Sequence, residues 1–302
     1  MRRARRIGAL KPALLIHNPA AGGRDTGRLI EALVASLSAS GFDAAVEETG
    51  YPGHATELAR RAVDRGSAEV VFACGGDGTL REVAAGLHGS KVPIGLVPAG
   101  TTNVLARGLD IPRKSLAAAN CYDATCSPTR KIDVGYCNGA IFLMMASIGV
   151  DAEVLRQTSP ERKRRWGRMA ILATAVSTIR TYTYPKLQAR IRQQSHEFSF
   201  LAACNIRYYG GSFQLTPDAE PDDGLLDVLL FEGGAMRTLG LVRDVVLRRH
   251  RRRRDLAIVR ASSVRIEGDQ LVTYQCDGDW FEARLPFEIE ISERRLGVLM
   301  PA

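Results

Sequence analysis

The sequence predicts an α/β protein in which an N-terminal Rossmann-like domain with a parallel sheet is followed by a mainly antiparallel β-sandwich domain. Three observations lead to this prediction. The chain has 302 residues, about twice the length of a typical domain. Strand-like and helix-like segments alternate over the first 110 residues, which is the pattern of βαβ units on a parallel sheet. The second half contains short strand-like runs between turn residues, a pattern typical of antiparallel sandwiches.

Apolar runs that end in turn residues are the expected strands of the first half. They cover residues 13–17, 42–47, 69–74 and 94–97. Helices are expected where apolar residues recur at helical spacing, and Gly41 and Gly66 follow the first two of them. These helices cover residues 26–39, 54–64 and 80–87. Ligands of parallel sheets bind at the carboxyl ends of the strands, so the loops there are the first candidates for a site.

The second half is expected to consist mostly of strands, with two helices. The strands are predicted over residues 131–135, 140–148, 187–192, 197–205, 225–231, 263–267, 271–276 and 287–292. The helices are predicted over residues 164–180 and 236–249. We place the boundary near residues 130–133, which gives domains of residues 1–131 and 132–302.

The composition is that of a globular protein with a basic surface. Hydrophobic residues make up 45% of the chain and charged residues 25%. Lysine and arginine outnumber aspartate and glutamate by 41 to 33, a net charge of +8 that indicates an anionic partner. Most of this excess lies in the arginine run at 248–254, with smaller clusters at 2–6 and 162–165. Each cluster is either a solvated surface or a contact for nucleic acid or an anionic membrane.

Several classes of protein are disfavoured by what the sequence lacks. The six cysteines show no CxxC pair and no zinc-finger spacing, so we expect reduced thiols in a cytoplasmic protein. The basic N-terminus is not expected to be a signal peptide, because Lys11 and Pro12 interrupt its apolar part. No apolar stretch reaches the roughly 18–20 residues that span a bilayer.

Residues 74–79, CGGDGT, follow a buried strand and open a helix. Adjacent glycines let the backbone approach a ligand closely, and the free N–H groups of a helix start favour an anion. Asp77 would repel a phosphate there unless a cation lay between them, so it implies Mg²⁺. The alternative is a tight turn in which Asp77 is the N-cap. The segment is not a P-loop, because it lacks the pattern GxxxxGK[ST]. It is also not the dinucleotide motif GxGxxG, because Arg81 stands where the third glycine belongs.

Two further loops follow strands of the same predicted sheet. Residues 18–23 read NPAAGG after the first strand, and residues 98–103 read PAGTTN after the fourth. Either loop alone is ordinary turn chemistry. Three such loops at the carboxyl ends of strands in one domain favour a binding site.

These three motifs, in this order, resemble the diacylglycerol kinase catalytic family, which includes sphingosine and ceramide kinases and bacterial lipid kinases. The second half is similar as well, through DDGLLD at 222–227 and CDGD at 276–279. The resemblance runs along nearly the whole chain. It implies an ATP-dependent lipid kinase that phosphorylates a lipid hydroxyl, such as that of diacylglycerol, in a cleft between the two domains.

The resemblance also implies particular site residues. The nucleotide would be bound by Asn18, Thr49, Gly75, Gly76, Asp77, Gly78, Thr79, Leu80, Arg81, Gly100, Thr101 and Asn103. Asp77 would act through Mg²⁺. A second, structural Mg²⁺ would be held outside the active site by Asp223 and by carbonyl groups of Glu220 and Leu225. The alternative for that segment is an acidic surface turn.

Phosphoryl transfer also needs a carboxylate that takes the proton of the hydroxyl group. Asp277 and Asp279 are the candidates, and they would face the same way on a strand unless a turn separates them. The family usually has glutamate where this chain has Asp279, whose side chain is shorter. We therefore expect Asp277 to be the base and Asp279 to bind metal or orient the site. Without the resemblance, two acids that flank a glycine in a hairpin turn are the simpler interpretation.

Two other functions fit part of the sequence. An NAD or sugar kinase shares the GGDGT loop, but the motifs at 98–103 and 277–279 argue against it. A nucleic-acid-binding regulatory protein would use the arginine run, but no known module accompanies it and aromatic residues are only 6% of the chain. We expect no nucleic acid but transient contact with an anionic membrane surface, which places the protein in the cytoplasm and peripherally at the membrane. The apolar residues of 166–184 would help there or form an interdomain core.

Overall fold

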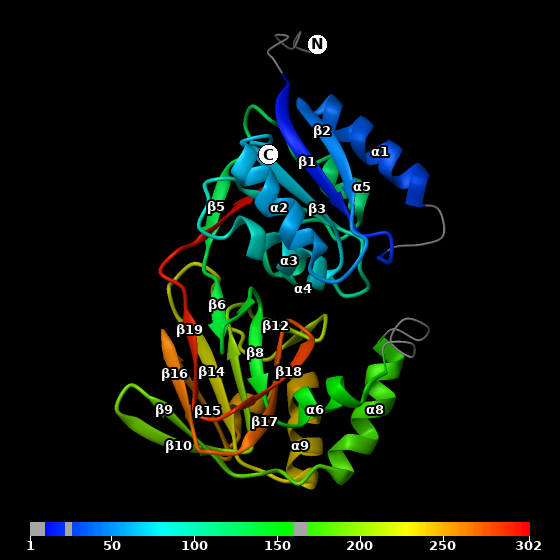
Figure 1. Cartoon of the computed structure of the whole chain (residues 1–302). Helices are drawn as coiled ribbons and strands as arrows, with labels where there is room; N and C mark the ends of the chain where they lie inside the picture. Colours follow the sequence, from blue (N-terminus) through cyan, green and yellow to red (C-terminus); the bar gives the residue numbers. More distant parts are fainter. Residues whose placement is uncertain (1–9, 22–25, 160–167) are drawn as a thin grey trace. The chain divides into compact units, whose positions relative to one another are not determined.

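The computed structural model describes residues 10–21, 26–159 and 168–302, which form two compact units (Figure 1). Unit 1 comprises the chain up to residue 131 together with residues 296–302, and unit 2 comprises residues 132–295. Some predicted features lie outside the described residues. These are the basic clusters at 2–6 and 162–165, Trp166, and the glycines at 22 and 23.

Unit 1 is built on a sheet with the strand order β2-β1-β3-β4-β20-β5. The pairs β1–β2, β1–β3, β3–β4 and β4–β20 are all parallel. The strands are β1 (Lys11–His17), β2 (Phe42–Glu48), β3 (Val70–Gly75), β4 (Ile94–Pro98), β5 (Thr129–Ile132) and β20 (Leu296–Leu299). The predicted parallel sheet is therefore confirmed.

Helices cover both faces of this sheet (Figure 1). They are α1 (Thr26–Ala39), α2 (His54–Arg65), α3 (Asp77–Leu87), α4 (Val104–Gly108) and α5 (Ser115–Ala119). Leu33 and Leu37 of α1 pack with Leu15 and Phe72 of the sheet in one buried cluster. α2 and α3 pack against each other so closely that a Cβ at Gly86 would lie 2.5 Å from the carbonyl oxygen of Thr56. These contacts fix the positions of the loops at the strand ends.

The last strand of the chain returns to unit 1. We expected the second domain to continue to residue 302, but β20 pairs with β4 in the parallel sheet. Leu296, Val298 and Leu299 are buried there, and Met300 donates a backbone hydrogen bond to Pro128 at 2.8 Å. These three apolar side chains gain more by covering the exposed edge of β4 than by remaining at the surface.

Unit 2 is a sandwich of two antiparallel sheets, as predicted. One sheet has the order β10-β9-β16-β19-β6-β7 and the other the order β15-β14-β11-β8-β17-β18. The strands are β6 (Gly135–Cys137), β7 (Ala140–Phe142), β8 (Met145–Ile148), β9 (Leu187–Ile191), β10 (Gln194–Phe198), β11 (Phe200–Cys204), β14 (Leu226–Phe231), β15 (Leu256–Ala261), β16 (Ser263–Glu267), β17 (Leu271–Cys276), β18 (Asp279–Arg284) and β19 (Phe287–Ile291). Phe142, Phe198, Leu201 and Val264 lie in the core between the sheets. A small ribbon of β12 (Tyr208–Tyr209) and β13 (Phe213–Gln214) adjoins them.

Two segments predicted as single strands are each divided between the sheets. Residues 140–148 form β7 in one sheet and β8 in the other, and residues 197–205 are divided in the same way around Ser199. At the second corner the Ser199 hydroxyl donates to the carbonyl oxygen of Gly233 at 2.7 Å. An apolar run does not show where a chain changes sheets, because both halves are buried in the same core.

The helices of unit 2 are α6 (Val150–Gln157), α8 (Arg168–Thr181) and α9 (Ala235–Val246), followed by a short 3₁₀ turn (His250–Arg252). α9 packs Leu241 and Val245 on the outer face of one sheet, against Phe200 and Phe231. The predicted helix over 236–249 ends earlier, because Arg248 adopts a positive φ of 56°. Helix α6 was not expected from the sequence.

Two of the exclusions drawn from the sequence can be checked on the fold. The six cysteines, which all lie within the described ranges, are free thiols. Among the helices of the described residues, none combines the length and apolar character needed to span a bilayer.

Candidate functional site

Four loops of unit 1 meet at the carboxyl edge of its parallel sheet. Thr49 follows β2, Asn18 follows β1, Gly75 and Gly76 end β3, and Gly100 follows β4. These strands are neighbours in the sheet, so their loops are neighbours as well. Backbone hydrogen bonds join them, from Asn18 to Cys74 at 3.0 Å and from Ala99 to Gly75 at 2.8 Å. The structure thus gathers most of the predicted nucleotide-binding residues at one edge.

Asn18 fastens the first loop to the start of α3. Its side-chain amide donates to the Thr79 hydroxyl at 2.9 Å, and its Oδ1 accepts from the backbone N–H of Ala20 at 2.9 Å. The Thr79 side chain is buried. In the loop after β2, the backbone N–H of Thr49 donates to the carbonyl oxygen of His17 at 2.9 Å. Asn18 and Thr79 therefore shape the site rather than point freely into it.

Bare backbone lines the centre of this edge. A Cβ at Gly75 would lie 2.5 Å from the Thr79 side chain, and a Cβ at Gly100 would lie 2.6 Å from the Cα of Gly76. Only glycine fits at these positions. Helix α3 begins directly after Gly76, so the N–H groups of its first turn have no acceptor within the helix. Such a turn next to backbone that carries no side chains can bind an anionic group such as a phosphate.

The Asp77 carboxylate joins the second and third loops. It accepts hydrogen bonds from the Thr102 hydroxyl at 2.9 Å and from the backbone N–H groups of Val104 at 3.1 Å and Leu105 at 3.2 Å. Asp77 therefore caps α4 and not its own helix, whose N-cap is Gly76. Three of about four lone-pair positions of the carboxylate are used in this way. That Thr102 is a partner of Asp77 is not evident from the sequence.

Asn103 and Leu80 serve the protein and not a ligand. Asn103 has a positive φ of 47° and is only 5% exposed. Its side chain binds both backbone groups of Gly100 at 3.0 Å and the carbonyl oxygen of Arg113 at 3.2 Å. The Leu80 side chain is fully buried, and its N–H already donates to Gly76. The expectation that Leu80 contacts a nucleotide is therefore not supported, whereas Thr101 is exposed and Gly78 and Arg81 are half-buried.

The second group of predicted residues lies in unit 2, in the hairpin between β17 and β18. Cys276 pairs with Asp279, so Asp277 and Gly278 form a two-residue turn with φ values of 52° and 93°. Asp279 is the first residue of β18 and is half-buried. The two carboxylates therefore do not share a strand face, because the turn separates them.

Asp277 is bound by the protein itself. Its carboxylate accepts from the backbone N–H groups of Leu143 at 2.7 Å, Met144 at 2.9 Å and Met145 at 3.0 Å, where the chain crosses from β7 to β8. Its own N–H donates to Met145 at 3.0 Å. Little accepting capacity is left for a substrate proton. This geometry favours Asp279 over Asp277 as a proton acceptor, the reverse of the sequence expectation.

A polar network behind this turn was missed by the sequence analysis. The Gly278 N–H donates to Gln275 at 2.9 Å, Gln275 donates to Ser147 at 2.7 Å, and Ser147 donates to Asp151 of α6 at 2.5 Å. The Tyr209 hydroxyl also donates to Asp151, at 3.4 Å. Burial raises the pKa of Asp151 from 3.8 to about 6, although these hydrogen bonds lower it. No motif surrounds Asp151 in the sequence, so only the fold could reveal it.

The predicted structural magnesium site is an acidic turn closed by an arginine. Asp223 pairs with Arg260 and accepts the Leu225 N–H at 2.9 Å, while Glu220 is exposed. Asp227, not predicted as a ligand, is buried, and its Oδ2 has no hydrogen bond and lies 3.8 Å from Arg260 Nε. An orphaned buried carboxylate oxygen fits a cation. No group of three His, Cys, Asp or Glu side chains in the described structure could hold a metal, so the site stays a prediction.

Each of the two units matches a known protein family. Residues 12–137 match the family model for the diacylglycerol kinase catalytic domain, and residues 144–300 match the model for the YegS C-terminal NAD kinase beta sandwich-like domain. A protein of Pseudomonas aeruginosa named "Probable lipid kinase YegS-like" is 36% identical over 222 residues, which cover 72% of this chain and 71% of that protein. A diacylglycerol kinase of Bacillus subtilis is 25% identical, with 97% of each chain covered.

Solved structures agree with this placement. A candidate diacylglycerol kinase from Bacillus anthracis superposes with a TM-score of 0.81 at 25% identity, covering 99% of this chain and 98% of its own. An NAD kinase from Archaeoglobus fulgidus, solved with ATP, gives a TM-score of 0.50 at 12% identity, with 96% of this chain and 94% of that chain covered. The second likeness concerns the fold alone.

Replacing Asp277 is expected to destabilise unit 2. In Asp277→Asn the amide group would face three backbone N–H donors and could accept from only some of them. We expect a loss of about 1–3 kcal/mol in the free energy of unfolding, the cost of an unsatisfied buried donor. Denaturant titration measures this loss, with Asp269→Asn, an exposed acid in the preceding turn, as the control. Equal stability of the two variants would contradict the anchoring role.

The raised pKa of Asp151 predicts a pH dependence of stability. The folded state binds this proton more tightly than the unfolded chain, so the free energy of unfolding should fall as pH rises from about 4 to about 6. Asp151→Asn removes this titration. The difference in the free energy of unfolding between variant and wild type should therefore shift in favour of the variant, by up to about 3 kcal/mol, as pH rises from acidic to neutral. Denaturant titrations of both proteins across this pH range measure the difference. If the two free energies of unfolding change with pH in the same way, the pKa of Asp151 is not raised by folding.

Proposed function

Because this chain belongs to the family of diacylglycerol kinase catalytic domains and YegS-like lipid kinases, we propose that it transfers the γ-phosphate of ATP to a hydroxyl group of a lipid such as diacylglycerol. The observation that best supports the proposal is the bare backbone at Gly75, Gly76 and Gly100 beside the start of α3. This edge fits a polyphosphate, because side chains are excluded and unsatisfied N–H groups remain.

Unit 1 binds and orients ATP in this proposal. The glycine loops and the first turn of α3 hold the phosphates, and Asp77 keeps the two loops together through its bonds to Thr102, Val104 and Leu105. Mg²⁺ supplies neutralisation of the phosphate charge. Since Asp77 has little free accepting capacity, most of the ligands of this ion would be phosphate oxygens and water, as is usual for Mg²⁺.

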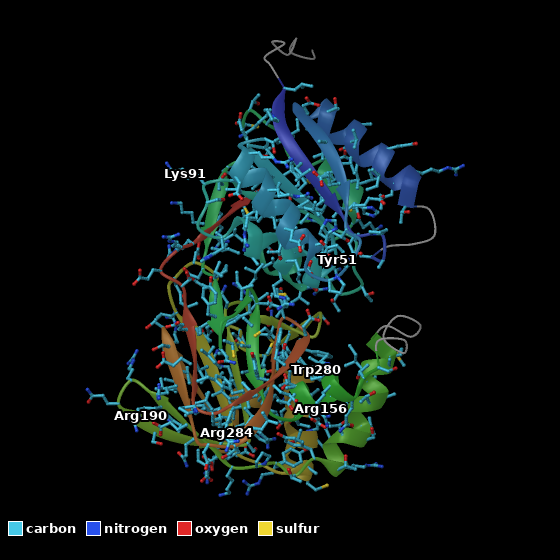
Figure 2. The ribbon with its side chains drawn as sticks, in the orientation of Figure 1. Tyr51, Lys91, Arg156, Arg190, Trp280 and Arg284 are labelled. Atoms are coloured by element: carbon cyan, nitrogen blue, oxygen red, sulfur yellow. The ribbon has the colours of Figure 1, made fainter. Side chains whose placement is uncertain are left out.

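Unit 2 supplies the proton acceptor. The oxygen of the lipid hydroxyl attacks the γ-phosphorus of ATP while Asp279 takes the proton of that hydroxyl. The bond between the γ-phosphorus and the oxygen of the β-phosphate breaks, and ADP leaves. Asp277 and the network from Gly278 to Asp151 hold the turn that carries Asp279. Trp280, the next residue, is 46% exposed and lies with Arg156 at the surface of unit 2 (Figure 2). Successive side chains of a strand point to opposite faces, so the indole offers an apolar surface on the other face of β18 from the Asp279 carboxylate.

A phosphate-transfer assay with a panel of acceptors tests the function. Wild type with ATP and Mg²⁺ should phosphorylate diacylglycerol and not NAD, and EDTA should abolish transfer. Asp279→Asn should lower kcat by about 10²–10⁴-fold, the usual contribution of a general base, while Asp279→Glu retains most of it. Asp269→Asn is the charge-matched control. Transfer to NAD alone, or full activity of Asp279→Asn, would contradict the proposal.

The glycine loops can be tested by nucleotide binding without any lipid. In Gly100→Ala the new methyl group would lie 2.6 Å from the Cα of Gly76, so the second and third loops must separate. We expect ATP affinity, measured by calorimetry, to fall at least about tenfold, which corresponds to about 1.4 kcal/mol. Gly27→Ala in α1, where a Cβ meets nothing within 4 Å, is the control. Unchanged affinity of Gly100→Ala would place the nucleotide elsewhere.

A further inference from the structure

Helix α9 has a second apolar face that unit 2 does not bury. Leu241 and Val245 pack on the sheet, but the opposite side of the helix is open. The exposed side chains there and in the following turn are Met236 (80%), Leu239 (42%), Val242 (49%), Val246 (55%) and Leu247 (51%). The first four follow one another at a spacing of three or four residues, which places them on one stripe, and Leu247 lies directly after the last of them. A surface helix normally carries polar residues at such positions.

The arginine run that follows α9 divides into structural and free members. Arg253 is 15% exposed and is held by Asp244 and Asp255 at 2.8 and 2.7 Å, and Arg251 pairs with Asp218 at 2.8 Å. The remaining arginines are exposed, and within the described part of the chain no acid pairs with them. They are Arg248, Arg249, Arg252 and Arg254. The net positive charge of the run therefore stays available next to the apolar stripe.

Helix α8 adds a second stripe beside the first. It contacts α9, and the two helices lie together on one side of unit 2 (Figure 1). Met169, Leu172 and Val176 of α8 are 64%, 58% and 49% exposed, again at a spacing of three and four residues. Two neighbouring helices thus leave aliphatic side chains in water, which marks an interaction surface rather than scattered exposure.

We propose that this docking face binds the surface of an anionic lipid bilayer. The docking face is defined by the exposed apolar residues of α9 and the unpaired arginines Arg248, Arg249, Arg252 and Arg254. A helix of this kind lies in the membrane interface with its apolar side among the acyl chains and its cations at the anionic headgroups. The inference extends the proposed function, because it names where the enzyme meets the membrane that contains its substrate.

Other classes of partner do not suit both the apolar and the cationic part of the docking face. A second copy of the chain in a twofold dimer would bring the same arginines together, which is unfavourable for a protein with a net charge of +8. Nucleic acid would neutralise the arginines but leave the aliphatic stripe against phosphates and water. A bilayer with anionic headgroups satisfies both the apolar and the cationic parts.

Vesicle co-sedimentation of the full chain tests the proposal. The vesicles contain phosphatidylcholine, either alone or mixed with phosphatidylglycerol, and neither ATP nor diacylglycerol is present. One variant combines Met236→Gln, Val242→Gln and Val246→Gln, and another combines Arg249→Gln and Arg252→Gln. The matched controls carry the same number of changes elsewhere: Arg60→Gln with Arg65→Gln on α2, and Leu10→Gln with Leu116→Gln and Leu271→Gln. All of these side chains are exposed, so the variants should fold.

We expect wild type and both controls to bind the anionic vesicles, with binding weakened by salt. Each docking-face variant should bind at least about tenfold more weakly, because one loses cations that face the anionic headgroups and the other loses apolar side chains that enter the acyl region. Equal binding by wild type and both variants would overturn the proposal. So would a dimer of wild type that the apolar variant dissociates, because the face would then be a self-interface.

The two proposals fail separately. If wild type binds vesicles but phosphorylates no lipid, the proposed function is wrong and the docking face stands. If wild type phosphorylates a water-soluble short-chain diacylglycerol but does not bind vesicles, the docking face is wrong and the kinase assignment stands. The docking-face variants should keep wild-type activity on the short-chain substrate, because the docking face contains none of the proposed catalytic or nucleotide-binding residues.

Discussion

One carboxylate at the start of α3 holds together the loops on which the rest of unit 1's candidate site depends. Asp77 accepts a hydroxyl hydrogen bond and two backbone N–H bonds from the third loop and α4. The two N–H groups would otherwise be unsatisfied donors at the start of α4. The close approach of Gly76 and Gly100 follows from this attachment, because both glycines lie on the segments that Asp77 joins.

Unit 2 also has a carboxylate that binds backbone N–H groups, at the hairpin between β17 and β18. Asp277 accepts three backbone N–H groups at the corner where the chain changes sheets. A carboxylate can bind adjacent N–H groups that no neighbouring strand satisfies, and the low dielectric of a buried corner strengthens such bonds. In both units an aspartate of a glycine-rich motif thus acts first on the backbone. In the function proposed above, the groups that act on ATP and on the lipid are their neighbours, namely the N–H groups after Gly76 and the carboxylate of Asp279.

The sequence could predict the fold class and the place of the site, because alternation and glycine loops are local signals. The parallel sheet, the sandwich and the meeting of loops 18–23, 74–79 and 98–103 all follow from them. It could not predict what these two aspartates bind, because their partners are distant in the sequence. The partners of Asp77 lie 25–28 residues away, and those of Asp277 lie 132–134 residues away. It also missed Asp151, whose raised pKa arises from burial by distant elements. The motif position of Leu80 likewise does not reveal that its side chain is buried in the core of unit 1.

The position of β20 has a consequence for how the protein is made. This strand lies between β4 and β5 in the sheet of unit 1, yet it is synthesised after the whole of unit 2. The sheet can therefore close only when residues 296–299 have emerged from the ribosome. Until then β4 presents an unpaired edge, which is the kind of surface that chaperones protect and that mispairs with other chains. Unit 1 therefore begins to form first and is completed last.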